Sequence, residues 1–261
     1  MEKISIPTTT PEETLDQVFE FFDRYELKGI GIGSFGPIGI DQTKDNYGYV
    51  LATPKKGWAQ FDFLGTIRKR YHIPVAWTTD VNAAAYGELK QGAAQGKNSC
   101  IYLTVGIGAG VVINEEIFSG IAHPEMGHIW VKRHPDDQYE GTCPYHKDCL
   151  EGLAAGPSIE ARIGIKGQDL PQDHPIWDIQ AFYIAQALIN YTLTLAPEKI
   201  ILGGGVMNQD HLLQKIRQQF VELMGGYMET PQVSEYIVRW GLPNESGIIG
   251  SLLLAEHEHQ K

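Results

Sequence analysis

The sequence predicts an α/β fold, because short apolar segments that suit β-strands alternate with longer segments of helical periodicity. Two places show this pattern clearly. The strand-like IPVAW (73–77) leads into the helix-like AAAYGELKQGAA (83–94), and APEKIILGGGVM (196–207) leads into a helix expected from about Asp210. The chain has 261 residues, which allows one large domain or two ordinary ones.

Composition excludes several classes of function. The formal net charge is −11 and the isoelectric point is about 5.2, which argues against a nucleic-acid surface. No apolar run approaches the roughly eighteen residues of a membrane span, and the N-terminus lacks a signal-peptide pattern. The 3 cysteines do not suggest a disulfide framework, and Cys100 sits in an apolar run where a buried thiol is expected. We expect a soluble cytoplasmic protein without a nucleic-acid or membrane partner.

The first hundred residues supply several elements. Residues 3–9 alternate like a short strand, and residues 8–27 carry Thr, Pro and Glu as helix-start signals. The apolar face of that helix is expected at Leu15, Val18, Phe19, Phe22 and Leu27. GIGIGSFGPIGI (29–40) predicts a buried strand and a turn that either approaches a ligand or is simply tight, and residues 53–72 predict a loop and a helix.

The remaining elements follow in order. Residues 100–120 predict a β-hairpin around the glycine-rich VGIGAG, which either cradles phosphate or simply bends the hairpin. A helix is expected from near Pro157, and a long amphipathic helix over residues 177–196. SEYIVRWGL (234–242) predicts a late strand, and residues 244–259 a final helix.

Asp80 and Asn82 lie at the junction between a predicted strand and a predicted helix. A carboxylate at the carboxyl end of a strand, beside a helix N-terminus, lies where α/β proteins bind ligands. Asp80 could equally cap the helix. The two interpretations are compatible, and this stretch alone does not separate them.

Cys143, His146 and Cys149 follow one another at short, equal spacing, with His128 upstream. Zinc takes Cys and His ligands in a tetrahedron, and one tight turn can supply several of them. We therefore expect a structural zinc ion on these four residues, with His128 at a strand edge before the apolar run IWV.

Two alternatives remain open for this stretch. Cys143 and Cys149 could form a disulfide, and His123 or His134 could replace His128 as a ligand. The carboxylates of Glu125 and Glu151 flank the cluster and are not needed by a four-ligand site. They are free to meet a polar substrate.

Six stretches together resemble the ROK family of sugar kinases, most closely its bacterial fructokinase branch. They span nearly the whole chain: GIGSFGPIG (31–39), TPKKGW (53–58), TDVNAAAYGE (79–88), HPEMGH (123–128), CPYHKDCLEGLAAGP (143–157) and LGGGVM (202–207). The TPKxGW and HPEMGH…CPYHxDC forms are more specific than the glycine loops. They separate this branch from glucokinases, whose zinc loop usually carries three cysteines.

The resemblance implies an actin-like ATPase fold, which is a ribonuclease H-like α/β fold of two lobes with a cleft between them. Residues 1–98, completed by a helix over 245–258, would form the first lobe. Residues 99–244 would form the second, with the zinc loop at 123–151. The implied reaction is ATP-dependent phosphorylation of fructose at its 6-hydroxyl with magnesium, and a homodimer is usual in the family.

The resemblance also implies roles for individual residues. Asp80 matches the catalytic base. The residues implied to bind the sugar are Asn82, Glu125, His128 and Glu151, and those implied to bind zinc are His128, Cys143, His146 and Cys149. The residues implied to bind ATP are Thr104, Gly106, Gly108, Pro157, Gly203, Gly204, Gly205, Val206 and Met207.

Two departures from the family pattern concern phosphate. The G-G-T-K loop that holds ATP phosphates has no counterpart in residues 1–261, and VGIGAG is shorter than the usual second phosphate loop. We therefore expect weak kinase activity from this chain alone; the alternative is a truncated or non-catalytic sugar-binding protein on the same scaffold. A ROK-type repressor is disfavoured, because no basic N-terminal helix-turn-helix is present.

Overall fold

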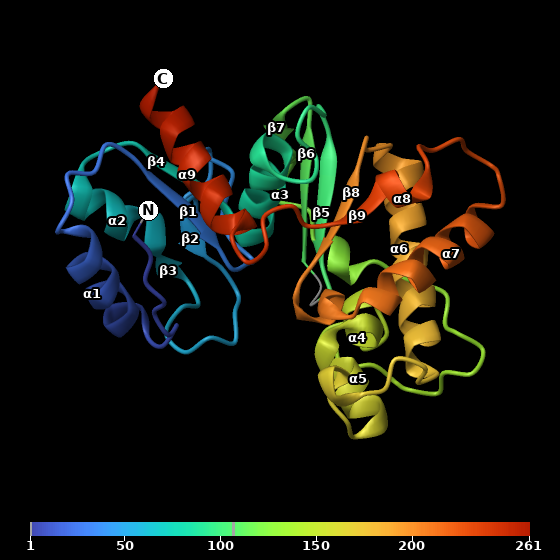
Figure 1. The fold of residues 1–261 in the computed structure, drawn as a ribbon. Coiled ribbons are helices and arrows are strands. Elements are labelled where there is room, and N and C mark those ends of the chain that lie inside the picture. The colour runs from blue at the N-terminus through green and yellow to red at the C-terminus, as the bar shows by residue number, and fades with distance from the viewer. Residues whose placement is uncertain (1, 106–107) are drawn as a thin grey trace.

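The computed structural model describes residues 2–105 and 108–261, whose elements gather in two halves (Figure 1). The first half contains α1 (Pro11–Phe22), β1 (Ile30–Ser34), β2 (Tyr49–Val50), β3 (Phe61–Asp62), α2 (Phe63–Tyr71), β4 (Val75–Thr79), α3 (Asp80–Gln91) and the C-terminal α9 (Ser246–His259). The strands of the second half are β5 (Cys100–Thr104), β6 (Ala109–Ile113), β7 (Glu116–Ile117), β8 (Ile200–Gly203) and β9 (Ile237–Arg239). Its helices are η1 (Met126–His128), α4 (Leu150–Ala154), α5 (Gly156–Ile163), η2 (Gly167–Asp169), α6 (Ile176–Leu195), η3 (Gly205–Asn208), α7 (Asp210–Met224) and α8 (Val233–Tyr236).

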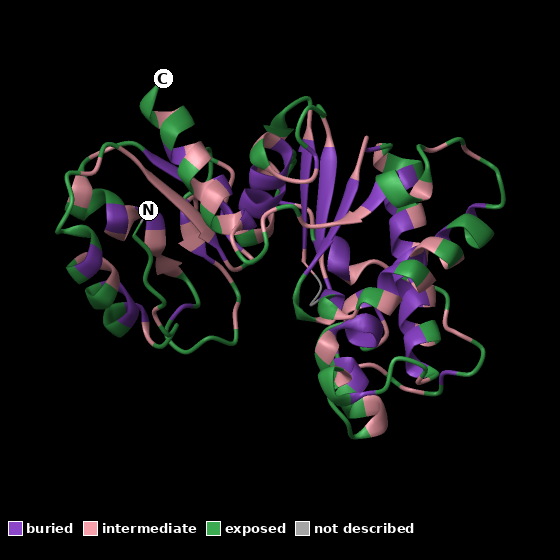
Figure 2. Cartoon of the chain, viewed as in Figure 1, coloured by how far each residue is buried: buried purple, intermediate pink, exposed green. Residues whose placement is uncertain are grey.

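The second half is built on a 5-stranded sheet in the order β7-β6-β5-β8-β9. β5, β8 and β9 are parallel, whereas β6 pairs antiparallel with β5 and forms the expected hairpin. Successive side chains of β5 point to opposite faces of the sheet. Ile101 and Leu103 enter a core with α4, α5, α6 and α7, and Cys100 and Tyr102 enter a smaller core with α3. The sheet is therefore buried on both faces (Figure 2).

The first half has smaller sheets. β1 and β4 pair in parallel, and β2 pairs with β3 in antiparallel fashion. The apolar side chains of α1 and α2 pack on this pair of parallel strands. An aromatic cluster fills the space beside it, with Trp58 contacting Phe35, Phe61 and Phe63 in edge-to-face geometry.

Helices α3 and α9 form the joint between the halves, since α3 packs on β5 and β6 while α9 packs on α3 and β1. Close approach requires glycine: a Cβ on Gly250 would lie 1.7 Å from the carbonyl oxygen of Ala83, and one on Gly87 would lie 2.4 Å from that of Ser246. The two helix backbones are therefore in direct contact.

A buried carboxylate fixes this joint. Glu88 of α3 has an exposed fraction of 0% and accepts hydrogen bonds from the backbone N–H groups of Ala93 at 2.7 Å, Gly241 at 2.8 Å and Leu242 at 3.1 Å. The hydroxyl of Ser246 donates to it at 2.7 Å. These donors lie where the chain leaves α3 for the second half and where it returns to α9, so one side chain holds both crossings.

Four expectations about local structure are wrong. The strand expected over 234–242 is shorter, because residues 234–236 belong to helix α8 and β9 covers only Ile237–Arg239. Residues 3–9 form no strand, because Pro7 lacks an N–H donor and the segment pairs with no strand among the described residues. In α1, Phe21 is buried and Phe22 is exposed, and the helix ends before Leu27. His128 lies in the short helix η1 and not at a strand edge, since Trp130 makes only an isolated bridge to Cys149.

Along the part of the chain that the structure describes, no helix combines the length and apolarity needed to cross a membrane.

Replacing Glu88 with Gln should lower the free energy of unfolding by about 1–3 kcal/mol, because an amide nitrogen turned toward N–H donors leaves buried groups unpaired. Urea denaturation measures the change. Glu20→Gln, on the exposed face of α1, is the matched control and should be neutral within about 0.5 kcal/mol. Equal stabilities of the two variants would contradict the assigned role of Glu88.

Candidate active site

Asp80 is the first residue of α3 and directly follows β4. Thr79 caps the helix, since its hydroxyl accepts the N–H of Asn82 at 3.2 Å. Asp80 is therefore not the cap. Its carboxylate accepts the neighbouring Val81 N–H at 2.8 Å and is exposed. The positive end of the helix dipole favours a negative charge at this position.

Protein surrounds the Asp80 carboxylate although solvent reaches it, as on the wall of a cleft. This partial desolvation raises the pKa of Asp80 above its ordinary value of 3.8. The hydrogen bond from Val81 N–H and the charge of Lys55 act in the opposite direction but do not outweigh it. The carboxylate is consequently more basic than an aspartate in water.

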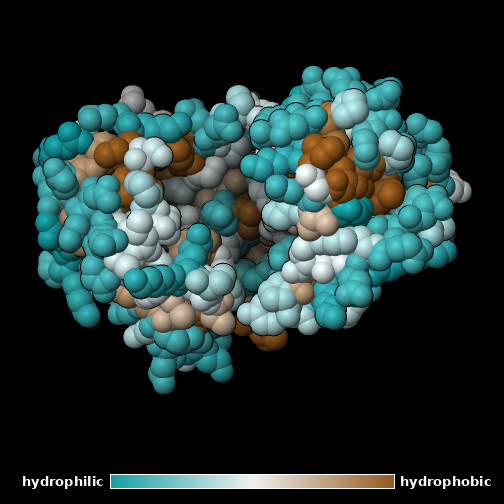
Figure 3. Space-filling view, turned by 90° about the horizontal axis from the view of Figure 1, so that it is seen from below, coloured by the Kyte–Doolittle hydropathy of each residue, from teal (hydrophilic) through white to brown (hydrophobic). Residues whose placement is uncertain are grey.

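The segment 123–125 of the second half meets the first half at this cleft. Ile38 N–H donates to the ring Nε2 of His123 at 3.1 Å, so neutral His123 carries its proton on Nδ1, which lies 3.5 Å from Glu125 Oε1. A Cβ on Gly36 would lie 3.3 Å from the His123 ring. Figure 3 shows the molecule hollowed between its two halves.

The four predicted metal ligands come together. The ligand atoms of His128, Cys143, His146 and Cys149 all lie within 4.8 Å of one another. His128 Nδ1 is 3.7 Å from Cys143 Sγ and 3.6 Å from Cys149 Sγ, and His146 Nδ1 is 3.9 Å from Cys143 Sγ. A tetrahedron with zinc bonds of roughly 2.0–2.3 Å has edges of about 3.3–3.8 Å, so the cluster has the scale of a zinc site.

The alternatives at this cluster can now be compared. Cys143 and Cys149 are free thiols and not a disulfide. His123 accepts from Ile38, and His134 accepts the N–H of Asp136, so both are engaged elsewhere. Burial raises the pKa of the Cys149 thiol to about 11, and a cation bound between the sulfurs would reverse that effect by stabilising the thiolate.

His128 joins the cluster to the cleft. Its Nδ1 faces the two sulfurs, and its Nε2 lies 3.7 Å from Glu151 Oε2. Glu151 is the second residue of α4, which begins immediately after Cys149. The cluster thus orients His128 and the start of α4 together, which leaves Nε2–H and the carboxylate available to a polar ligand.

The predicted nucleotide-binding turns lie at neighbouring strand ends. β5 and β8 are adjacent and parallel, so both turns emerge at one edge of the sheet, where α/β proteins bind ligands. Thr104 closes the first turn, because its N–H donates to Gly108 O at 2.9 Å and its hydroxyl accepts Gly108 N–H at 3.0 Å. Gly204, at φ +84°, packs the second turn against the first. Gly106 lies outside the described residues.

A cavity of about 460 Å³ opens beside these turns. Pro157 of α5 lines it together with Gly205 and Val206 of η3, while Gly203 and Met207 are buried behind it. Trp177 and Lys166 complete part of the wall. The predicted nucleotide residues that the structure describes are therefore gathered around one cavity and its adjoining turns.

Asn82 is placed differently from the other predicted sugar residues. Its exposed fraction is 2%, its amide donates to Thr78 Oγ1 at 3.2 Å, and its carbonyl accepts Val111 N–H at 3.4 Å. In this structure it ties α3 to β6, and its contact with sugar stays a prediction.

Sequence reasoning missed the electrostatic role of Lys55 and the hydrogen bond that His123 accepts from Ile38. Both residues lie inside stretches that carry the family resemblance, TPKKGW and HPEMGH, and this membership was the available signal. Both contacts depend on packing between segments distant in sequence.

Comparison with known proteins agrees with this geometry. The ROK family model matches residues 1–258. A fructokinase from Pediococcus pentosaceus is 51% identical over 257 residues, which cover 98% of this chain and 89% of that protein. A ROK hexokinase from Thermus thermophilus superposes with a TM-score of 0.81 at 24% identity, covering 98% of this chain and 90% of that chain.

A ROK family glucokinase from Streptomyces griseus, solved in complex with glucose and AMPPNP, gives a TM-score of 0.72 at 24% identity, covering 98% of this chain and 91% of that chain. The actin-like ATPase fold expected from the resemblance is confirmed. Because the family model and a relative at 51% identity both extend over nearly its whole length, the chain belongs to the ROK family.

Proposed function

We propose that this ROK-family sugar kinase transfers the γ-phosphoryl group of ATP to the 6-hydroxyl of fructose, with Asp80 as general base. The observation that carries the proposal is the exposed, partly desolvated Asp80 carboxylate at the head of α3. Similarity to the P. pentosaceus fructokinase supports fructose as the acceptor. The AMPPNP complex of the S. griseus glucokinase supports an adenine nucleotide as the donor.

The reaction needs a base because a primary hydroxyl is a weak nucleophile. Asp80 accepts the hydroxyl proton while the sugar oxygen bonds to the γ-phosphorus. The bond from that phosphorus to the β–γ bridging oxygen breaks, and ADP leaves with the electron pair. Desolvation favours this role, since it makes the carboxylate a stronger proton acceptor.

The sugar would lie between Asp80 and the residues of the second half that face the cleft. Glu125 and Glu151 can accept hydrogen bonds from sugar hydroxyls, and His128 Nε2–H can donate one. The position of His128 depends on Cys143 and Cys149, which lie on the opposite side of its ring. Zinc on the four-residue cluster would stabilise this loop and fix the His128 tautomer.

The nucleotide would occupy the cavity lined by Pro157 and Val206, with its phosphates toward the turns that follow β5 and β8. Backbone N–H groups of glycine-rich turns suit phosphate oxygens. Magnesium bound with ATP would neutralise part of the phosphate charge.

Asp80→Asn should reduce kcat by about 10²–10⁴-fold, because an amide cannot accept the proton. Fructose should still raise the melting temperature of the variant, since the hydrogen-bonding shape is kept. A coupled assay for ADP release and a thermal-shift titration measure the two effects. Asp16→Asn, exposed on α1, is the control and should retain full turnover. Undiminished turnover by Asp80→Asn would refute its role as base.

In a plot of kcat/KM against pH, the fall at low pH (the acidic limb) should follow protonation of Asp80. The midpoint of this limb should lie above the ordinary aspartate pKa of 3.8. Lys55 lowers the pKa of Asp80, so Lys55→Met should move this limb to higher pH. Lys56→Met removes an adjacent, exposed cation as the control and should leave the limb in place. If the acidic limb of Lys55→Met stays at the same pH or moves to lower pH, the charge interaction between Lys55 and Asp80 is disproved.

Protein prepared without chelator should contain about one zinc ion per chain, and Cys143→Ser should lose both zinc and thermal stability, because structural zinc contributes folding free energy. Elemental analysis and a melting curve measure the losses. Cys100→Ser, which also changes a buried thiol, should keep its zinc. Wild-type protein without zinc would rule out the metal site.

A further inference from the structure

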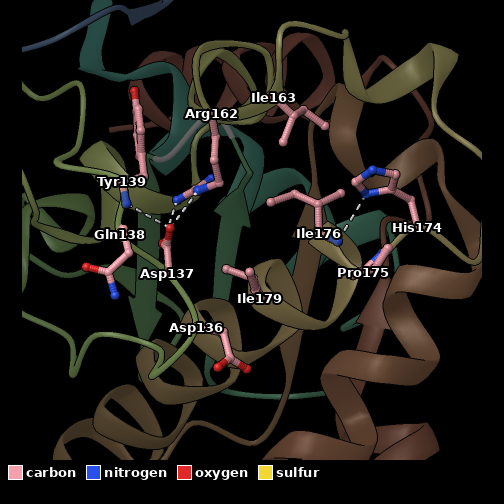
Figure 4. A pocket seen from close by; sticks show the side chains of 10 residues that line it. All are labelled: Asp136, Asp137, Gln138, Tyr139, Arg162, Ile163, His174, Pro175, Ile176 and Ile179. Carbon is pink, nitrogen blue, oxygen red and sulfur yellow. Dashed lines mark hydrogen bonds and ion pairs between the residues drawn. The ribbon is translucent and has the colours of Figure 1, made fainter.

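Helix α5 lies between two hollows. On one side Pro157, Ile159 and Glu160 line the proposed nucleotide cavity, and on the other Arg162 and Ile163 line a second hollow of about 430 Å³ (Figure 4). Of the residues of α5, all of which are described, Ile159 is the only apolar one that is fully buried. Apolar packing therefore holds this helix weakly, and its position depends on polar contacts.

Arg162 supplies several of those contacts. Its guanidinium donates to both carboxylate oxygens of Asp137, at 3.1 and 3.0 Å, and to the carbonyl oxygens of Leu153 at 2.9 Å and Ser158 at 3.2 Å. It also lies over the Tyr139 ring, 4.5 Å from the centroid. Leu153 belongs to α4, so Arg162 joins α5 to the helix that begins with Leu150 and Glu151.

Asp137 is itself held in place. Tyr183 of α6 donates its hydroxyl proton to Asp137 at 2.7 Å, and Tyr139 N–H donates at 3.1 Å. Burial opposes ionisation, yet Arg162 and Tyr183 keep the pKa of Asp137 below its ordinary value. The side chains of Asp137 and Arg162 are 2% and 7% exposed, so the pair is ionised and shielded from water. The contacts between the two side chains are the dashed lines that join Asp137 and Arg162 in Figure 4.

A second polar junction lies at the other end of α5. Ser158 donates to Gly152 O at 2.9 Å, and its hydroxyl lies 3.0 Å from that of Thr142, the residue before Cys143. α4 is anchored independently, because Leu150 and Leu153 are buried in the core and Leu150 N–H donates to Ile129 O. α5 contributes only Ile159 and the partly buried Ile163 to that core, so its position depends more on polar contacts than the position of α4 does.

We propose that the Asp137–Arg162 pair positions α5, and with it Pro157, against the η3 side of the nucleotide cavity. Arg162 is a positioning residue for nucleotide binding and does not touch the reacting atoms. The inference rests on the proposed function, because it assigns that cavity to the nucleotide. It goes further than that function because it assigns the ion pair an effect on nucleotide binding and none on sugar binding.

The competing explanation is that the pair only stabilises the fold. Replacing a buried ion pair by apolar side chains of similar volume often leaves stability unchanged or improved, whereas breaking it from one side is costly. Stability and positioning can therefore be separated by comparing single and double variants.

Arg162→Lys should raise the KM for ATP on the order of tenfold, because an ammonium group cannot reach all four acceptors of the guanidinium. This change is comparable with the loss of about one hydrogen bond. The KM for fructose should stay within about twofold. Isothermal titration with ADP, at a temperature where the variant is fully folded, should show the same loss. Phe220→Leu, a buried change in α7, should lower thermal stability and leave both KM values unchanged.

The double variant Asp137→Leu/Arg162→Met restores apolar packing without the directed hydrogen bonds. Its melting temperature should recover relative to Arg162→Met, while its affinity for ADP should remain weakened. Recovery of both would overturn the inference, as would unchanged ADP affinity in Arg162→Lys and in the milder Tyr183→Phe. If wild-type protein binds no ADP, the proposed function itself fails; if it binds ADP and these variants bind equally well, only the positioning role fails.

Discussion

The geometry of this protein depends on the hydrogen bonds that the buried carboxylate of Glu88 accepts. Asp80 lies at one end of α3, in the first half, and the cavity proposed for the nucleotide lies in the second half. Glu88, near the other end of α3, bonds the segments through which the chain crosses between the halves. Because four donors converge on one buried carboxylate, the joint has one strongly preferred arrangement.

The contacts between the halves at the joint and at the cleft differ in strength. At the joint, Glu88 is shielded from water and accepts four hydrogen bonds, with the α3 and α9 backbones in contact. At the cleft, the bond from Ile38 N–H to His123 is a single neutral one beside an exposed Glu125. A single neutral hydrogen bond contributes only about 0.5–1.5 kcal/mol of net free energy. The halves are therefore fixed at the joint and only lightly held across the cleft.

The sequence predicted the parts of this structure that depend on local pattern. The junction of β4 and α3, the hairpin of β5 and β6, and the strand–glycine–helix unit at Gly203 follow from periodicity and turn residues. The four-residue metal cluster followed from ligand spacing. Assignment of the individual roles came from the family resemblance, and for Asp80 periodicity alone could not separate a base from a helix cap.

What sequence could not supply depends on contacts between distant segments. Residues 3–9 alternate like a strand but find no partner, and an unpaired strand is not stable. Nothing in the sequence around Glu88 indicates that its four donors come from residues 93 and 241–246. In the same way, Arg162 is an ordinary charged residue near a helix end in the sequence, and the structure is needed to show that its side chain is buried against Asp137.

The charge distribution explains how one cleft can serve both a base and a polyanion. The chain has a net charge of −11, and the acceptor side of the cleft carries the carboxylates of Asp80, Glu125 and Glu151. A triphosphate would be repelled there. The predicted phosphate contacts lie instead at the strand ends of the second half, on turns of glycine backbone whose N–H groups are uncharged donors. Lys55 lies close enough to Asp80 to lower its pKa. In the proposed function, separating carboxylates that accept protons from backbone groups that meet phosphate would let an acidic protein bring a sugar hydroxyl and an anionic donor together.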